Sequence, residues 1–225
     1  MLTPAEHLVI TLDGPAGAGK STVAKSLAGR LGITYLDTGA MYRALTLKAL
    51  RLKMDLSDEE ALTALARNTK ITFKETADGS LDITLDGEDV AKAIRTPEVT
   101  NNTFYVAKTA GVRTLMVAWQ RALGENRSLV TDGRDQGTVV FKDARYKFYV
   151  DCDVEERVQR RYKELAAVGK PVDLDQLRAD MKDRDQKDFT RSVGPLKKAK
   201  DAITVDSTGL TVEGTVDKIM KLIHL

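Results

Sequence analysis

The chain has little cysteine, little histidine and no long hydrophobic run. Its single cysteine, Cys152, cannot form an internal disulfide, which favours a reducing compartment. No stretch approaches the roughly 18 apolar residues of a membrane-spanning helix, and the first residues lack the basic region and apolar core of a signal peptide. His7 and His224 stand alone in the sequence, so we see no metal cluster. We therefore predict a cytoplasmic protein with no membrane partner.

An excess of charge of one sign is also missing. The 35 Lys and Arg residues are interleaved with 33 Asp and Glu residues, and the net charge is only +2. A nucleic-acid-binding protein needs a concentrated basic face, so we expect no nucleic-acid partner. We find no repeat and no low-complexity segment. A length of 225 residues is sufficient for one large α/β domain with excursions, and we expect a monomer.

The most informative stretch that is present is rich in glycine. It follows an apolar run at residues 7–12, which predicts a buried strand, and precedes residues 22–31, which predict a helix ending at Gly32. Strand, glycine loop and helix in this order are typical of a phosphate-binding P-loop, and we favour this over a glycine-rich turn with a chance lysine. The predicted nucleotide-binding residues are Gly14, Pro15, Ala16, Gly17, Ala18, Gly19, Lys20, Ser21 and Thr22.

Each part of this loop has a chemical role in binding a nucleoside triphosphate. Glycines let the backbone bend around an anion, and the free N–H groups of the loop and of the helix N-terminus point at phosphate oxygens. Lys20 supplies a positive charge to the β- and γ-phosphates, and Ser21 supplies an oxygen ligand to Mg²⁺. The loop therefore predicts a bound nucleotide and magnesium.

The remaining patterns alternate strands with helices. Further strands are predicted at residues 33–36, 128–131, 146–150 and 202–205; helices are predicted from about 43 to 53, 58 to 68, 97 to 124 with a break near Gly111, 155 to 168, 175 to 188 and 212 to 223. Ser57 and Glu60 form a predicted capping box for the helix at 58–68. Thr96, followed by Pro97, is the predicted cap of the helix that begins at 97. Trp119 is predicted to be a core residue. Such a chain folds as a parallel sheet covered by helices, with ligands at the carboxyl ends of its strands.

One segment departs from this alternation. Residues 71–74 and 81–85 show period-2 patterns, and the Asp-Gly pairs at 78–79 and 86–87 are typical of tight turns. We predict a small antiparallel insert here.

Arginines gather where a second anion could bind. Arg43 and Arg134 lie just beyond predicted strand ends, and Arg184, Asp188 and Arg191 share one helix face if the helix persists that far. For any one of these arginines a solvated surface ion pair is an equal alternative. Together they exceed what one triphosphate requires, and planar guanidinium groups suit bidentate phosphate binding. The set predicts a second phosphorylated ligand.

Two phosphorylated ligands imply direct phosphoryl transfer between them. A phosphate oxygen is already a nucleophile, so alignment and charge neutralisation dominate catalysis. A lid must exclude water, and the charged helical hairpin at residues 155–191, with Gly169 at its turn, is the candidate. Arg157 and Arg161 share a face of its first helix.

These residues carry a family resemblance over nearly the whole chain. The sequences at 13–15 (DGP), 36–43 (LDTGAMYR), 132–141 (DGRDQGTVVF) and 206–208 (DST), with the antiparallel insert, resemble bacterial-type cytidylate kinases, in the nucleoside monophosphate kinase group of P-loop proteins. The resemblance implies a P-loop NTPase-like three-layer α/β fold with a five-stranded parallel sheet, the small antiparallel insert and a helical lid. It implies a core at residues 1–36, 125–154 and 192–225, a monophosphate-binding region at 37–124 and a lid at 155–191.

The resemblance also implies an activity, the transfer of the γ-phosphoryl group of ATP to CMP or dCMP, and roles for residues. Thr38, Arg43, Arg134 and Arg191 match acceptor-phosphate positions, Arg184 and Asp188 match acceptor-sugar positions, Arg113 and Asp135 match cytosine-reading positions, and Asp132 belongs to the same predicted substrate-binding set. Lys20, Arg134, Arg157 and Arg161 form the implied catalytic set, the last two as lid arginines on the donor side. Thr38 stands where serine is usual, and Phe104 stands where a base-contacting hydroxyl is expected, with Thr103 as its substitute.

Two alternatives remain open from the residues alone. Another small-molecule P-loop kinase, acting on UMP, a nucleoside or shikimate, would need a carboxylate base for a hydroxyl acceptor, and Asp37 or Asp132 could serve. A P-loop switch GTPase would use Asp-x-x-Gly, which residues 206–209 match, but no Asn-Lys-x-Asp motif follows them.

Overall fold

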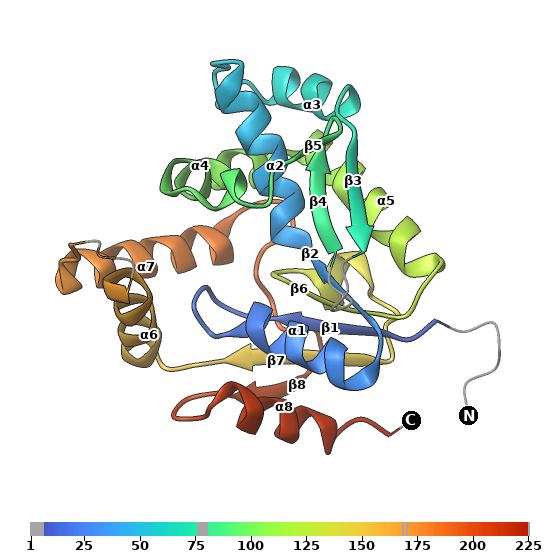
Figure 1. Cartoon of the computed structure of the whole chain (residues 1–225), viewed down its shortest axis with the longest axis vertical. Coiled ribbons are helices and arrows are strands. Elements are labelled where there is room, and N and C mark those ends of the chain that lie inside the picture. Colours follow the sequence, from blue (N-terminus) through green and yellow to red (C-terminus); the bar gives the residue numbers. More distant parts are fainter. Residues whose placement is uncertain (1–6, 76–80, 168, 170, 225) are drawn as a thin grey trace.

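A five-stranded parallel sheet forms the centre of the molecule (Figure 1). The structure is a computed structural model and describes residues 7–75, 81–167, 169 and 171–224. The strands are β1 (Val9–Asp13), β2 (Thr34–Asp37), β6 (Leu129–Gly133), β7 (Tyr146–Asp151) and β8 (Ile203–Asp206), in the spatial order β2-β6-β1-β7-β8. The chain order reverses beside β1, and in open parallel sheets ligands bind at such a reversal, beyond the carboxyl ends of the strands. The predicted parallel sheet is confirmed.

Two helices that are far apart in the sequence cover this sheet together. Helix α1 (Lys20–Leu31) packs on β1, β2 and β6, and α8 (Val212–Met220) packs on β8 and on α1 (Figure 1). Fully buried Ile10, Leu12 and Leu27 belong to the apolar cluster between the sheet and these helices. Their burial fixes the sheet against the helix that begins at the glycine loop.

A second body of elements lies beyond the carboxyl end of β2 (Figure 1). It contains α2 (Thr38–Arg51), α3 (Glu59–Arg67), α4 (Pro97–Lys108), α5 (Ala110–Glu125), the short 3₁₀ helix η1 (Ala93–Arg95) and the antiparallel strands β3 (Ile71–Glu75), β4 (Leu81–Leu85) and β5 (Glu88–Asp89). Its own apolar cluster includes buried Leu45 and Met116, with Trp119 packed against it as predicted. The insert is confirmed.

Local signals in this region have mixed outcomes. The turn at Asp86 and Gly87 has φ of 51° and 92°, as a tight Asp-Gly hairpin turn requires, whereas the predicted turn at 78–79 lies outside the described residues. The Oγ1 atom of Thr96 accepts the N–H of Val99, which confirms that cap. The predicted capping box at Ser57 and Glu60 was wrong about its cap.

The residue that caps α3 is Asp58 rather than Ser57. The Asp58 carboxylate accepts the N–H of Ala61 at 2.9 Å, while the N–H and hydroxyl of Ser57 are donated to Asp55. Aspartate and serine are equally good caps, and the bonds to Asp55 leave Ser57 one residue outside the helix. Other helix ends differ from prediction by a few residues: α1 begins at Lys20, and α8 ends at Met220.

Two charged helices project from the sheet as a hairpin (Figure 1). They are α6 (Val154–Ala167) and α7 (Leu174–Thr190), which pack on each other. Gly169 has φ of 70° just after α6, and Asp173 caps α7 by accepting the N–H groups of Asp175 and Gln176. A π-helical turn, η2 (Gln136–Val140), follows β6 and was not predicted. In the part of the chain that the structure describes, no helix is long and apolar enough to cross a membrane.

Candidate active site

The glycine loop lies between the end of β1 and the first turn of α1. A Cβ atom on Gly14 would lie 2.0 Å from the carbonyl oxygen of Val150, so only glycine fits where the loop leaves the sheet. Gly19, with φ of 81°, caps α1 without any side-chain hydrogen bond. The N–H groups of the first turn of α1 therefore remain available to an anion.

Lys20 is buried at the base of this loop, with 5% of its surface exposed. Its Nζ atom donates to the carbonyl oxygen of Pro15 at 2.6 Å. Burial, and then the positive charge of Arg134, lower the pKa of Lys20 to about 7, while Asp132 and Asp188 act against them. A phosphate oxygen here would favour the charged form of the amine.

A hydroxyl and a carboxylate meet beside the loop. The Ser21 hydroxyl donates to Oδ2 of Asp132 at 2.7 Å, and the Tyr35 hydroxyl donates to Oδ1 of the same carboxylate at 2.8 Å. Burial raises the pKa of Asp132, and the nearby charge of Asp37 raises it further. A cation bound beside Asp132 would favour its charged form and so lower its pKa again.

This donor set fits magnesium. Mg²⁺ prefers oxygen ligands and is usually held by one or two carboxylates together with substrate phosphates and water. Among the described residues, no group of three or more His, Cys, Asp or Glu side chains could hold a metal unaided. Ser21 and Asp132 therefore suit an ion that arrives with a triphosphate.

On the other side of β6, α2 brings an arginine to the same edge. Asp37 caps α2 by accepting the N–H of Ala40 at 2.9 Å, and its second oxygen accepts from Arg43 at 2.7 Å. The Nε atom of Arg43 is buried without a hydrogen-bond partner among the described residues. Thr38 begins α2 and donates its hydroxyl to the carbonyl oxygen of Asp132 at 2.7 Å.

The loop after β6 carries two residues that are held by ion pairs. The Nε atom of Arg134 donates to Asp188 of α7 at 2.6 Å. Asp135 pairs with Arg113 of α5, and both side chains are about 95% buried or more. Arg191, also buried, lies 3.9 Å from the carboxylates of Asp135 and Asp188. The predicted residues of α5, of the loop after β6 and of the C-terminal end of α7 are thus brought into one network.

Arg184 is the exception within this network. No described residue forms a hydrogen bond or an ion pair with its guanidinium group, although Arg134, Arg43 and Arg161 lie near enough to repel it. Arg184 is solvent-exposed, yet crowding by neighbouring groups and then the charge of Arg134 lower its pKa to about 10, while Asp188 acts against them. A crowded, unpaired guanidinium beside other arginines marks a position for an anion.

The two predicted lid arginines differ from each other. Arg157 is buried and donates to the carbonyl oxygens of Cys152 and Ala16 and to Asp185 of α7 at 2.7 Å. It therefore ties α6 to the glycine loop and to α7, and its contact with ATP stays a prediction. Arg161 is half exposed and pairs with Glu164 at 2.8 Å.

Sequence reasoning missed Arg160, which lies between them. Its guanidinium group donates to the carbonyl oxygen of Ser207 at 2.7 Å and lies 3.7 Å from where a Cβ atom of Gly19 would be. It also missed Tyr35, which orients Asp132. Neither residue belongs to a motif whose spacing indicates its partner.

The Phe104 ring in α4 contacts a lysine of α7 and a neighbouring tyrosine. Lys187 of α7 lies 5.8 Å from the centre of the Phe104 ring, and Tyr105 lies edge-on to it. Thr103 donates its hydroxyl to the carbonyl oxygen of Val99 at 2.7 Å. Its predicted substitution for a base-contacting hydroxyl stays a prediction.

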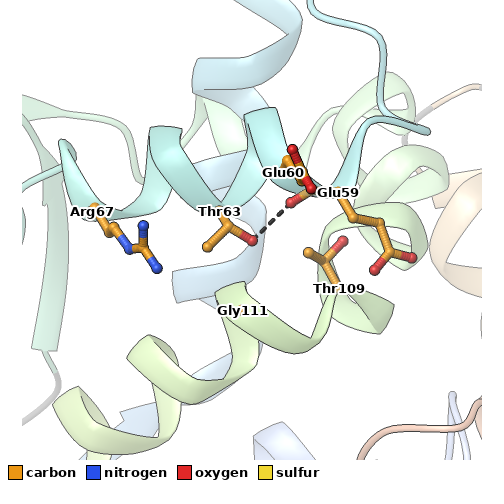
Figure 2. Close-up of a pocket in the computed structure, with 6 residues that line it drawn as sticks. All are labelled: Glu59, Glu60, Thr63, Arg67, Thr109 and Gly111. Carbon is orange, nitrogen blue, oxygen red and sulfur yellow. Dashed lines mark hydrogen bonds between the residues drawn. The ribbon is translucent and has the colours of Figure 1, made fainter.

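An open cavity elsewhere does not involve these residues. It measures about 390 Å³ and lies between α3 and the start of α5, lined by Glu59, Glu60, Thr63, Arg67, Thr109 and Gly111 (Figure 2). In Figure 2 the Thr63 hydroxyl donates to the backbone of Glu59, a bond within α3. Two glutamates would repel a phosphate, so we place the active site at the glycine loop instead.

Comparison with known proteins decides the family. A family model described as cytidylate kinase matches residues 10–225. The chain belongs to the cytidylate kinase family. A cytidylate kinase of Desulforamulus reducens is 51% identical over 215 residues, which is 96% of both chains. One of Geobacillus sp. (strain WCH70) is 51% identical over 218 residues, which is 97% of both chains.

Cytidylate kinase membership confirms the resemblance and the predicted activity, that of an ATP-dependent phosphotransferase acting on CMP and dCMP. It decides against a switch GTPase and against a shikimate or nucleoside kinase. A crystal structure of an uncharacterized protein from Eubacterium ventriosum aligns with a TM-score of 0.54 and 15% identity, covering 97% of this chain and 98% of that chain. At this identity the likeness concerns the fold alone.

Proposed function

We propose that this chain transfers the γ-phosphoryl group of ATP to the phosphate of CMP or dCMP, giving CDP or dCDP and ADP. We further propose that it acts as a monomer in the cytoplasm and serves pyrimidine nucleotide metabolism. The family supports the two substrates. The observation that supports the residue roles is the group of arginines beside Lys20, in which Arg184 has no ion-pair partner among the described residues.

On the donor side, the residues act through charge and backbone amides. The backbone N–H groups of Gly14 and of residues 16–22 bind the ATP phosphates, and Lys20 contributes its charge once a phosphate raises the pKa of its amine. Ser21, with Asp132 behind it, would hold magnesium, which would neutralise phosphate charge. Arg161, and Arg157 after release from its present partners, complete the donor side.

On the acceptor side, the arginines divide by position. Thr38, Arg43, Arg134 and Arg191 bind the phosphate of CMP, and Arg184 and Asp188 bind its sugar. Arg113 and Asp135 read the cytosine edge, where the amino group needs an acceptor and N3 and O2 need a donor. The buried Arg113–Asp135 pair is preorganised for this, because each side chain already fixes the other.

The chemistry follows from this placement. The acceptor phosphate oxygen attacks the γ-phosphorus of ATP and ADP leaves, so no general base is required. Guanidinium groups and Lys20 align two anions that would otherwise repel each other, and they stabilise the charge of the migrating group. We assign the core to 1–36, 125–154 and 192–225, the monophosphate-binding region to 37–124, and the water-excluding lid to 155–191.

The proposal is tested by the choice of acceptor. Purified protein with ATP and magnesium is assayed for ADP release with CMP, dCMP, UMP, AMP, cytidine and shikimate. We expect CMP and dCMP to give the highest kcat/KM, and cytidine, which lacks a phosphate, to give no release above the background hydrolysis. Faster release with cytidine or shikimate than with CMP would refute the proposal.

A further inference from the structure

A buried carboxylate joins the glycine loop to the loop that carries Arg134 and Asp135. Asp13 is the last residue of β1 and is 4% exposed. Its Oδ1 atom accepts the N–H of Gln136 at 2.8 Å, and its Oδ2 atom accepts the N–H of Gly137 at 2.7 Å. These two N–H groups open the helical turn η2, and such groups have no partner within their own turn.

The two bonds fix the residues just before them. Gly133 is held in the sheet, where it lies opposite Asp13 in the β1–β6 ladder. Gln136 and Gly137 are held by the Asp13 carboxylate. Only Arg134 and Asp135 lie between these anchors, so the position of Asp13 determines where their backbone lies.

We propose that Asp13 is a positioning residue that sets the acceptor-binding Arg134 and Asp135 against the ATP-binding loop. This inference rests on the proposed function for the roles of those two residues. Asp13 immediately precedes Gly14, so the donor loop and the acceptor loop share one anchor. A shift of about 1 Å in such alignment can cost roughly 10²-fold in rate.

A packing role alone does not account for a carboxylate at this position. Burial raises the pKa of Asp13 to about 6, while the N–H groups of Gly137 and Gln136 act to lower it. An apolar residue would avoid the cost of burying a charge. A carboxylate offers two acceptor oxygens to two adjacent N–H groups, and this is the feature that the loop uses.

Asp13→Asn tests the inference because it keeps the shape and replaces one acceptor oxygen with an N–H donor. We expect kcat/KM for CMP to fall roughly 10- to 100-fold, with KM for ATP within about twofold of the wild type. Thr11→Val is the matched control. Thr11 lies on the same strand, and its hydroxyl is buried without a partner among the described residues, so both constants should hold.

A double-mutant cycle separates positioning from general damage. In an Arg134→Ala background, Asp13→Asn should cause a several-fold smaller loss with CMP, because its effect passes through that loop. The inference would be overturned by an undiminished loss of kcat/KM for CMP in that background, by a rise in KM for ATP as large as that loss, or by the same loss in Thr11→Val. Wild-type protein that fails to phosphorylate CMP would instead refute the proposed function.

A second variant covers the case in which Asp13→Asn does not fold, judged by circular dichroism. In Gly137→Ala, the new Cβ atom would lie 3.1 Å from Oγ1 of Thr11 and 3.2 Å from Cδ of Lys147. It would also lie 3.4 Å from Oδ2 of Asp13, so it crowds the contact between residue 137 and this carboxylate while both carboxylate oxygens are kept. We expect kcat/KM for CMP to fall while KM for ATP stays within about twofold of the wild type, and a rise in KM for ATP as large as the fall in kcat/KM for CMP would overturn the inference.

Discussion

Asp188 neutralises a group of arginines, and its loss should destabilise the protein before any substrate is added. Its carboxylate accepts from Nε of Arg134 at 2.6 Å and lies 3.9 Å from Arg191. Burial acts to raise the pKa of Asp188, but Arg134, Arg191 and Arg184 outweigh burial and lower the pKa below its ordinary value of 3.8. The charged carboxylate therefore stabilises the fold above that pH, and the contribution is lost as the pH falls through the lower folded value.

The size of the effect follows from burial. Removing one partner of a buried ion pair costs about 3–5 kcal/mol, because the other charge is left uncompensated. The side chains of Arg134 and Asp188 are 18% and 13% exposed, so we take the lower end of that range. For a chain of this size, about 3 kcal/mol corresponds to a fall in Tm of roughly 6–12 °C. We expect this fall for Asp188→Asn at pH 7.

Thermal melts followed by circular dichroism, without nucleotide, measure the effect. The matched control is Asp183→Asn on the same helix, because Asp183 pairs with Lys187 at 2.6 Å and both side chains are more than half exposed. An exposed pair contributes at most about 1 kcal/mol, so this variant should lose no more than about 4 °C. Melting of the two variants within about 2 °C of each other would refute the reasoning.

Three kinetic predictions address individual roles. Lys20→Ala should lower kcat by at least roughly 10²–10³-fold, as the loss of one preorganised charge donor does, and near-normal turnover would remove Lys20 from the reaction. Arg43→Ala should raise KM for CMP far more than KM for ATP, whereas equal increases would contradict its place on the acceptor side. Asp188→Ala should change the ratio of CMP to dCMP activity, and an unchanged ratio would separate Asp188 from the sugar.

Much of the fold could be predicted because its signals are local. The apolar run before Gly14, the glycines and the helix after them lie within one short segment, and the Asp-Gly pair at 86–87 specifies its own turn. Thr96 and Pro97 specify a helix start in the same way. The cap of α3 was missed because serine and aspartate compete at adjacent positions with nearly equal strength.

The site could be predicted only as a set of residues and not as a set of contacts. The sequence indicated Arg157 by helical spacing, but its partners come from the glycine loop and from α7, which approach it only in the folded chain. The role of Asp13 depends on η2, whose amides become neighbours of β1 through the parallel pairing of β1 with β6. No local pattern encodes such contacts, because they depend on sheet order.

The most direct test of the central claim follows the phosphoryl group itself. The protein is incubated with ATP labelled in the γ-phosphate, CMP and magnesium, and the products are separated by chromatography. If the two nucleotides bind with their phosphates facing each other, the label will appear in the β-phosphate of CDP in step with ADP formation. Label released only as inorganic phosphate, or no label in CDP, would contradict the account.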